Sequence, residues 1–271
     1  MSLNDHSIRH ERLYERVIRS LALRILGGTL SPDSVRNTEA ELCRDMGVSR
    51  TVLREAVKVL AAKGLVEVRP KTGMRIKPRS EWTLIDRDVM EWQAEIGFSE
   101  DYVRNLFQVR LMLEPPTAVA AAGNATQEDL DSIRDAFGSM EQEFDDFSAY
   151  VQSDCDFHDR ISRATHNDYL IQINRIILDA VRGAQSLFQR ERGQAKYALD
   201  LHKDVCEAIL HRDQEWAKSA MTRLIHEAEK DTLRVLKNLD QPLHQSATRR
   251  TPASLRKKPG TLTTEVPAVG V

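Results

Sequence analysis

A chain of 271 residues is long enough for two domains, and 41% hydrophobic with 30% charged residues is the composition of a soluble globular protein. No apolar run approaches the ~18 residues that a membrane-spanning helix needs, and the N-terminus lacks the apolar core of a signal peptide. Three scattered cysteines, Cys43, Cys155 and Cys206, fit a reducing compartment better than a disulfide framework. We therefore expect a cytoplasmic protein with no membrane partner.

The net charge of −2 hides a strong asymmetry along the chain. Residues 1–80 carry 16 Lys and Arg against 9 Asp and Glu, a balance of +7, and residues 241–271 carry 5 against 1, a balance of +4. The middle region, 81–240, carries 18 against 31, a balance of −13. A basic segment joined to an acidic one is typical of a DNA-binding domain with a separate sensing domain, because DNA repels the acidic part.

Three helices are predicted in the basic N-terminal segment. Residues 8–26 have an uneven helical stripe of apolar residues that ends at a glycine pair. Residues 38–46 form a short amphipathic helix closed by Gly47, and residues 48–60 form another. Two short helices joined by a tight turn at a glycine describe a helix-turn-helix.

The second helix of this pair has an apolar side and a basic side. Ser49 stands at its start as a predicted N-cap. Arg50, Thr51, Arg54 and Lys58 lie opposite the apolar stripe. In a helix-turn-helix the first residues of this helix face the major groove, where Arg bonds guanine edges and Arg, Lys and Thr bond phosphates. The alternative is an ordinary pair of helices with a solvated basic side.

Residues 64–78, GLVEVRPKTGMRIKP, predict two strands joined by a turn. The first strand is rich in Leu and Val, the turn contains Pro and Gly, and the second strand alternates apolar residues with Arg75 and Lys77. A helix-turn-helix followed directly by a basic hairpin is a winged helix.

The runs TEAEL and GVSRTVLREAVKVLAAKGLVEV, together with Gly73, resemble the N-terminal domain of GntR-family bacterial transcription regulators. The resemblance implies binding to double-stranded operator DNA as a homodimer. Members of the family usually carry an arginine where this chain has Ala40, so one typical contact is missing, and Arg36 or Arg44 is a candidate replacement. The residues expected to contact DNA are Arg36, Ser49, Arg50, Thr51, Arg54, Lys71, Thr72 and Gly73.

Residues 80–98 connect this domain to the rest of the chain and are rich in apolar side chains. Trp82 and Trp92 should pack against one or both domains, because two tryptophans are costly to leave in water. The sequence WTLIDRDVMEW resembles the linker of GntR members that regulate sugar-acid catabolism.

From residue 99 onward the pattern is helical, and we expect an antiparallel all-helical bundle. The predicted helices span 100–122, 127–144, 147–165, 168–190, 195–211 and 213–237. The Pro115-Pro116 pair should kink the first of them. Residues 239–271, rich in Pro, Ser, Thr and basic residues, are predicted to be a disordered tail that is either inert or adds nonspecific DNA affinity. The chain thus divides into a winged helix-turn-helix (1–79), a linker (80–98), a helical domain (99–238) and a tail (239–271), a mainly α fold.

Asp154 and His158 stand four residues apart, so on a helix both point to one face. A carboxylate and an imidazole at this spacing are half of a metal site, although such a pair is more often a surface interaction. The surrounding sequence resembles the FCD ligand-binding domain of the FadR subfamily of GntR regulators. There Asp and His from one helix join two later histidines around a divalent metal, usually zinc or nickel, and His202 matches the third ligand.

The fourth metal ligand is in doubt. The family spacing places it at Leu224, and the nearest histidine, His226, is two residues on. Two residues turn a helical side chain by about 200°, so His226 should face away. A site with three protein ligands, or a pocket with no metal, is the alternative. Cys206 lies one turn after His202, but a buried structural thiol is the favoured reading.

Arg110 matches an arginine of the family that lies near the ligand cavity, so it is the candidate anchor for an anionic effector. The alternative is an ion pair with Glu114, four residues further along the helix.

These features predict a transcription regulator, a repressor by family resemblance, whose operator binding responds to a small carboxylate such as a sugar acid. One alternative is an enzyme built on the metal cluster, although the sequence has no candidate nucleophile, phosphate-binding loop or catalytic carboxylate pair to support it. The other is an architectural DNA-binding dimer that responds to no effector.

Overall fold

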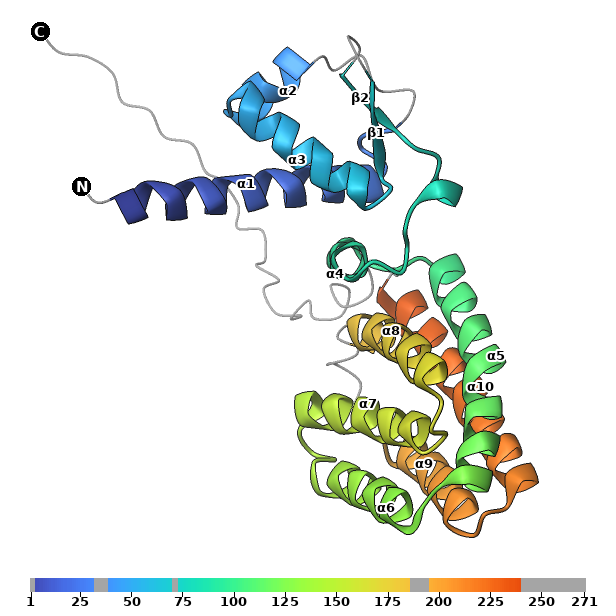
Figure 1. Ribbon diagram of the computed structural model, residues 1–271. Helices are drawn as coiled ribbons and strands as arrows, with labels where there is room; N and C mark the ends of the chain where they lie inside the picture. Colours follow the sequence, from blue (N-terminus) through green and yellow to red (C-terminus); the bar gives the residue numbers. More distant parts are fainter. Residues whose placement is uncertain (1–2, 32–38, 70–72, 186–194, 240–271) are drawn as a thin grey trace, which may run out of the picture.

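The computed structural model describes residues 3–31, 39–69, 73–185 and 195–239, and these form a small N-terminal domain above a larger helical bundle (Figure 1). The elements are α1 (Leu3–Leu26), α2 (Glu39–Met46), α3 (Arg50–Ala62), β1 (Val66–Arg69), β2 (Gly73–Ile76), a 3-10 turn η2 (Arg79–Glu81), α4 (Arg87–Ile96), α5 (Glu100–Asn124), α6 (Gln127–Gln142), α7 (Phe147–Arg163), α8 (Asp168–Gln185), α9 (Ala195–Leu210) and α10 (Gln214–Leu239). The predicted mainly α fold is confirmed.

The N-terminal domain is a winged helix. α1 and α3 pack together, α2 precedes α3, and β1 pairs with β2 in an antiparallel hairpin whose register places Val66 opposite Ile76. Leu21, Leu53, Leu60 and Leu65 are fully buried in its core. The predicted turn between α2 and α3 falls at Gly47, whose φ of 64° favours glycine.

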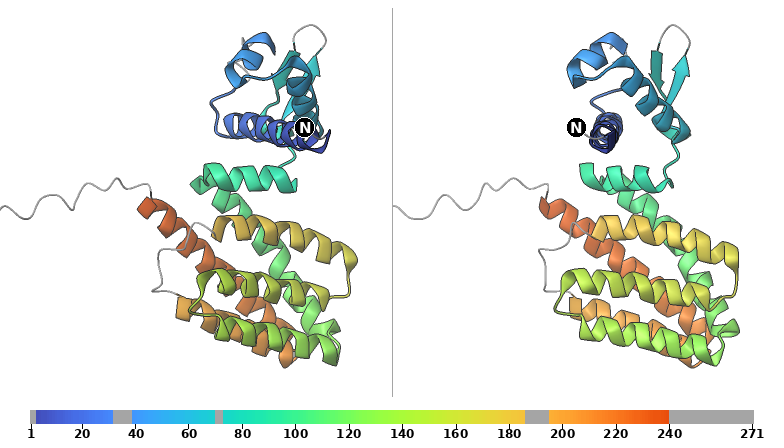
Figure 2. Two further views of the ribbon diagram at one scale, coloured as in Figure 1. Left: turned by 90° about the vertical axis from the view of Figure 1, so that its left-hand side faces the viewer. Right: turned by 60° about the vertical axis from the view of Figure 1, so that its left-hand side comes forward.

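The connector between the domains contains a helix, α4, which the sequence analysis treated only as a packed segment. It lies between the N-terminal domain and the bundle, against α1 and α8 (Figures 1 and 2). Trp82 and Trp92 are half-buried against the N-terminal core, as predicted. α4 also buries Val89 in that core, while Met90 packs on its other side against α5 and α8. One helix therefore joins the two domains through two different faces.

Polar contacts hold α4 to the N-terminal domain. Asp86 caps the helix by accepting bonds from the backbone N–H groups of residues 88 and 89. The Lys63 ammonium, at the end of α3, lies 2.9 Å from Asp86 Oδ1 and 2.6 Å from Asp88 Oδ2. Arg19 of α1 pairs with Glu95. α4 is therefore attached to the N-terminal domain by polar as well as apolar contacts, while its cluster with α5 and α8 is apolar.

The bundle consists of six helices, α5 to α10, whose bounds agree with the predicted ranges to within a few residues. The predicted end of α8 near residue 190 lies outside the described residues. Ser99, Thr126 and Asp146 cap the first three, and Thr126 forms a capping box with Asp129. α5 continues through Pro115 and Pro116 as one helix, and the predicted kink at this pair stays a prediction. No helix in the described residues combines the length and apolarity needed to cross a membrane.

Asp86 provides a test of how α4 is attached. Asp86→Ala removes the cap of α4 and one partner of Lys63, so we expect the free energy of unfolding to fall by about 1–2 kcal/mol. Urea denaturation followed by tryptophan fluorescence measures this. Asp179→Ala, an exposed acidic residue on α8, is the control and should change stability by less than about 0.5 kcal/mol. Equal effects of the two substitutions would show that the cap contributes little.

Candidate functional site

The exposed side of α3 is the candidate DNA-binding face. Ser49 caps the helix by accepting a bond from Val52 N–H at 3.3 Å, as predicted. Arg50, Thr51 and Arg54 are exposed, opposite the buried apolar stripe. They are exposed in the first turns of α3, the second helix of the helix-turn-helix, as contact with the major groove requires. The contact itself stays a prediction.

Arg54 has a partner within the protein. Its Nε lies 2.9 Å from Glu39 Oε1 at the start of α2. The guanidinium must leave or share this carboxylate before it can contact DNA. The predicted contacts Arg36, Lys71 and Thr72 lie outside the described residues, and Gly73 is the first residue of β2.

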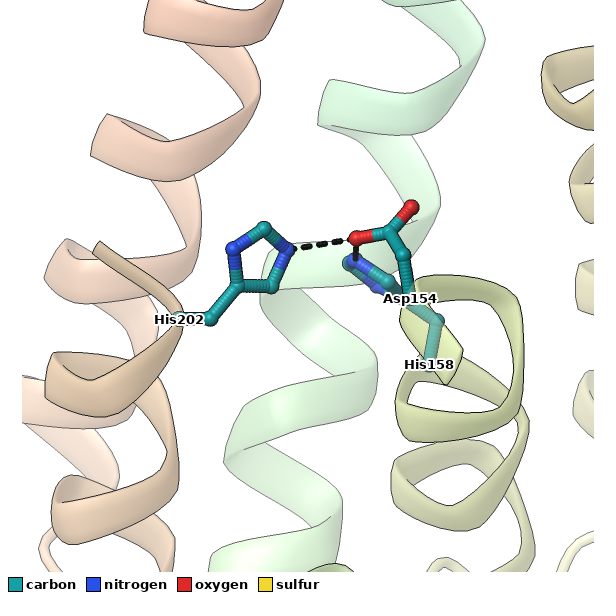
Figure 3. Close-up of side chains that lie close together, drawn as sticks. All are labelled: Asp154, His158 and His202. Atoms are coloured by element: carbon teal, nitrogen blue, oxygen red, sulfur yellow. Dashed lines mark ion pairs between the residues drawn. The ribbon is translucent and has the colours of Figure 1, made fainter. Parts of the chain in front are cut away.

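The candidate metal centre lies inside the bundle, where α7 and α9 meet α5 (Figure 3). Asp154, His158 and His202 each offer a ligand atom, and these atoms all lie within 4.8 Å of one another. Asp154 Oδ1 is 2.7 Å from His202 Nε2 and 3.8 Å from His158 Nε2. All three residues are at least 95% buried. The helical spacing of Asp154 and His158 therefore brings them together as predicted, and the fold adds His202.

The outer nitrogens of both imidazoles are fixed by hydrogen bonds. His202 Nδ1–H donates to the Ala198 carbonyl at 2.7 Å, and His158 Nδ1–H donates to Glu114 Oε2 at 2.9 Å. Both Nε2 atoms are buried and neither forms a hydrogen bond to another described residue, so the 2.7 Å contact with Asp154 Oδ1 is the close polar contact of His202 Nε2. When Nδ1 carries the proton of a neutral imidazole, Nε2 presents a lone pair, which is the arrangement of metal-bound histidines.

The contact between His202 and Asp154 therefore needs a positive charge. At this distance of 2.7 Å, the Nε2 lone pair of a neutral imidazole would repel a carboxylate oxygen. A proton on Nε2 or a metal ion bound to both atoms would remove this repulsion. A metal ion would also serve His158 Nε2, whereas one proton would leave that atom without a partner. The donor set thus fits a divalent cation.

Arg110 forms the ion pair with Glu114 that was the alternative to effector binding. Arg110 Nε lies 2.6 Å from Glu114 Oε1 and Nη2 lies 3.3 Å from Oε2, with both side chains buried. Burial alone would raise the pKa of Glu114, but Arg110 and then His158 lower it to about 2. Arg110 is therefore not a free anchor, and Glu114 is an ionised partner of His158. No pattern in the sequence indicates this second role of Glu114, because nothing local links residues on different helices.

A cavity of about 10 Å³ adjoins the centre, with Glu114, Thr117, His158, Ser162 and Asn174 in its wall. Such a volume holds about one water molecule. Asn174 Nδ2 donates to Thr117 Oγ1 at 3.2 Å, while Asn174 Oδ1 is buried and has no hydrogen-bond partner among the described residues. These polar groups lie beside the candidate metal ligands, where the hydroxyl groups of a bound molecule could contact them, and no sequence pattern indicated them.

His226 and Cys206 do not join the cluster. His226 is exposed on the outer surface of α10 beside Lys218 and Lys230, so its inclusion as a fourth ligand is wrong and the spacing argument against it is confirmed. Leu224 is buried instead. Burial raises the pKa of the Cys206 thiol to about 12, so it stays protonated, as a structural thiol does.

A winged helix joined to a helical bundle is an architecture of DNA-binding transcription regulators. Residues 13–76 match the family model "Bacterial regulatory proteins, gntR family", and residues 105–227 match the model "FCD domain". The chain belongs to the GntR family of bacterial regulatory proteins and carries an FCD domain, so it is a DNA-binding regulator and not an enzyme.

Named relatives agree with this class. The galactonate operon transcriptional repressor of Escherichia coli K12 is 30% identical, over 78% of this chain and 93% of its own. The Uxu operon transcriptional regulator of Escherichia coli K12 is also 30% identical, over 78% and 83%. A solved structure described as "Lar controls the expression of the Listeria monocytogenes agr system and mediates virulence" aligns with a TM-score of 0.57 at 20% identity, covering 82% and 96%. At that identity it supports the fold alone.

The pair of Arg54 and Glu39 allows a test of base recognition. Arg54→Ala should weaken operator binding by about 1–3 kcal/mol and random-DNA binding by less, because a bidentate contact to guanine is lost. Glu39→Gln frees Arg54 and should tighten binding to random DNA.

Lys71→Ala is expected to weaken binding to operator DNA and to random DNA equally and to reduce the salt dependence of binding. Gel-shift titrations on both DNAs measure these effects, and equal losses on both for Arg54→Ala would reject base recognition.

Proposed function

We propose that this chain is a dimeric repressor whose operator binding is released by a small carboxylate metabolite, of the sugar-acid class, bound beside a divalent metal. Asp154, His158 and His202 would hold the metal, zinc or nickel. The observation that carries the proposal is the pair of buried Nε2 atoms that lie 2.7 Å and 3.8 Å from one oxygen of Asp154. The names of the galactonate and Uxu relatives support the effector class.

The charge balance of the pocket supports an anionic effector only when a cation is present. Glu114 and Arg110 neutralise each other, so an ionised Asp154 leaves the buried group with one net negative charge. A bound divalent cation reverses this to one net positive charge and leaves a position for a carboxylate. This local charge is needed, because the surrounding region 81–240 has a balance of −13 and opposes the entry of anions.

The size of the cavity suggests how binding reaches the DNA. A cavity of about 10 Å³ is too small for a sugar acid, so an effector must separate the helices around it. Asn174 and Leu178 of α8 line this cavity, while Ile177, Ala180 and Val181 of the same helix pack in the cluster that contains Met90 of α4. A shift of α8 would therefore move α4 and the N-terminal domain attached to it.

The metal is tested by its ligands. We expect protein loaded with zinc or nickel and then dialysed to retain metal, and His158→Ala or His202→Ala to lose it, because two protein ligands hold a divalent ion weakly. His226→Ala is the matched control and should retain the metal. Elemental analysis measures the content. Loss of metal on His226→Ala, or no metal in the parent under any loading condition, would contradict the proposed centre.

The effector is tested by release of DNA. Galactonate and other aldonates, with the uncharged parent sugars as controls, are screened by thermal shift with and without metal. Those that bind should release operator DNA in a gel-shift titration. Asn174→Ala should keep the metal and the operator affinity but require about 5–100-fold more effector, since one hydrogen bond to a buried partner is lost. Unchanged release would exclude Asn174, and no release by any carboxylate would favour the effector-independent architectural dimer.

Arg110 needs a different test from simple truncation. Arg110→Ala leaves Glu114 buried and unpaired, which costs about 3–5 kcal/mol and obscures any effect on sensing. Arg110→Lys keeps the charge and loses the bidentate geometry. We propose that Arg110 acts by positioning Glu114 and, through it, His158.

A further inference from the structure

A groove of about 850 Å³, which we call the junction groove, lies where the N-terminal domain meets α4 and the bundle. Leu26, at the end of α1, and Arg79 of η2 belong to its N-terminal side, and α4 contributes Gln93. Helices α5, α8 and α10 supply the bundle side. A volume of this size accommodates a small organic molecule. The junction groove shares no residue with the cavity of about 10 Å³ beside the candidate metal centre, so the two are separate.

Most of the wall of the junction groove is apolar. Met90, Leu106 and Ile177 are buried in this wall, where α4, α5 and α8 meet. Tyr102 packs its ring against Phe98 with 4.8 Å between the ring centroids. Such a surface favours the apolar part of a ligand, because both lose unfavourable contact with water on binding. A sugar acid, with a hydroxyl group on almost every carbon, is a poor match for this wall.

Gln93 shows that the contact of α4 with the bundle leaves one polar atom unsatisfied. Its side chain is buried in the groove wall, and Nε2 donates to the Gly97 carbonyl at 2.9 Å, which identifies the other terminal atom as Oε1. Oε1 is buried and accepts no hydrogen bond from a described residue. A buried acceptor without a donor costs free energy. Widening of the groove would give this oxygen a donor from water or from a ligand, which offsets part of the cost of moving α4.

Two opposite charges, Arg79 and Asp101, stand in the wall of the junction groove. Both side chains are exposed, and neither forms an ion pair with a described residue. Arg79 lies over the ring of Trp82, 5.5 Å from its centroid, a contact that holds the guanidinium in place. Burial raises the pKa of Tyr102 and the charge of Arg79 opposes this rise, so the guanidinium lies near the first turn of α5, where Asp101 also stands.

We propose that the junction groove binds an amino acid with an aromatic or branched apolar side chain. Its carboxylate would bond Arg79 and its ammonium group would bond Asp101, while the side chain lies against the apolar wall. An anion without an ammonium group would be repelled by Asp101, and a cation without a carboxylate would be repelled by Arg79. A zwitterion satisfies both charges, and its apolar side chain satisfies the rest of the wall.

Such a ligand would connect the two domains directly. Arg79 follows the β-hairpin of the winged helix, whereas Asp101 lies in the first turn of α5, so a molecule bonded to both spans the junction beside α4. Its binding would favour one position of the winged helix over others and would change the operator affinity. The inference goes beyond the proposed function, because it requires neither the metal nor the sugar acid.

The test is a calorimetric titration of the full chain, treated with a chelator, with L-phenylalanine and L-leucine. Three compounds each lack one feature of L-phenylalanine: phenylacetate lacks the ammonium group, phenethylamine lacks the carboxylate, and glycine lacks the apolar side chain. We expect L-phenylalanine or L-leucine to bind, and each of the three compounds to bind about 10–100-fold more weakly, since each loses one of the contacts.

Two exposed positions allow the charged contacts to be removed without disturbing the core. Arg79→Gln and Asp101→Asn should each weaken binding of the amino acid by about 10–100-fold, because a charge-assisted hydrogen bond is lost. Arg104→Gln is the matched control, since Arg104 is exposed on the same helix as Asp101, pairs with Glu100 and lies outside the groove wall. In gel-shift titrations, the amino acid should change the operator affinity of the parent and of Arg104→Gln, and leave that of Arg79→Gln unchanged.

Each outcome decides the proposal. Binding by the parent and by Arg104→Gln, weakened in both groove variants, supports it. Absence of binding by both amino acids, equal binding of phenylacetate, or an unchanged operator affinity of the parent overturns it. Binding that appears only after metal is restored would place the amino acid at the metal centre, and binding that is lost as the protein concentration rises would show that a second copy covers the groove. Either result also overturns the proposal. Release of operator DNA by sugar acids is measured separately, so the proposed function survives each of these failures.

Discussion

A chain of buried polar contacts crosses the bundle and fixes the site. Arg110 holds Glu114 on α5, Glu114 holds His158 on α7, and Asp154 of α7 approaches His202 on α9. Each of these groups would be costly to bury alone, because an unpaired charge or polar atom in the core loses its hydration without compensation. The contacts therefore impose a fixed relation among α5, α7 and α9, and leave two imidazole nitrogens directed at one point.

Under the proposed function, the site would act on the N-terminal domain through two helices that each pack on two sides. α8 contributes Asn174 to the pocket on one side and packs Ile177 against α4 on the other. α4 in turn buries Val89 in the core of the winged helix and Met90 against the bundle. Because these helices are in direct contact, a displacement of α8 at the pocket would be expected to shift α4 as well.

The sequence predicted most of the fold because its signals are local. Residues next to each other in the chain determine the helix starts at Ser99 and Thr126 and the glycine turn at Gly47. The Asp154–His158 pair also follows from local spacing, whereas His202 depended on family resemblance. The bond between Glu114 and His158 joins different helices, and no pattern within either helix indicates it. α4 was missed as a helix because its apolar residues face two different cores.

Pro115 and Pro116 have a mechanical consequence for α5. Prolines lack an N–H, so the carbonyl groups of Leu111 and Met112 receive no helical hydrogen bond from them. α5 is therefore most easily bent at the turn that carries Glu114, between a half that meets α4 and a half embedded in the bundle core. The easiest bending point of α5 therefore coincides with Glu114, the residue that orients His158. The helix that lines the pocket is least stiff beside the pocket.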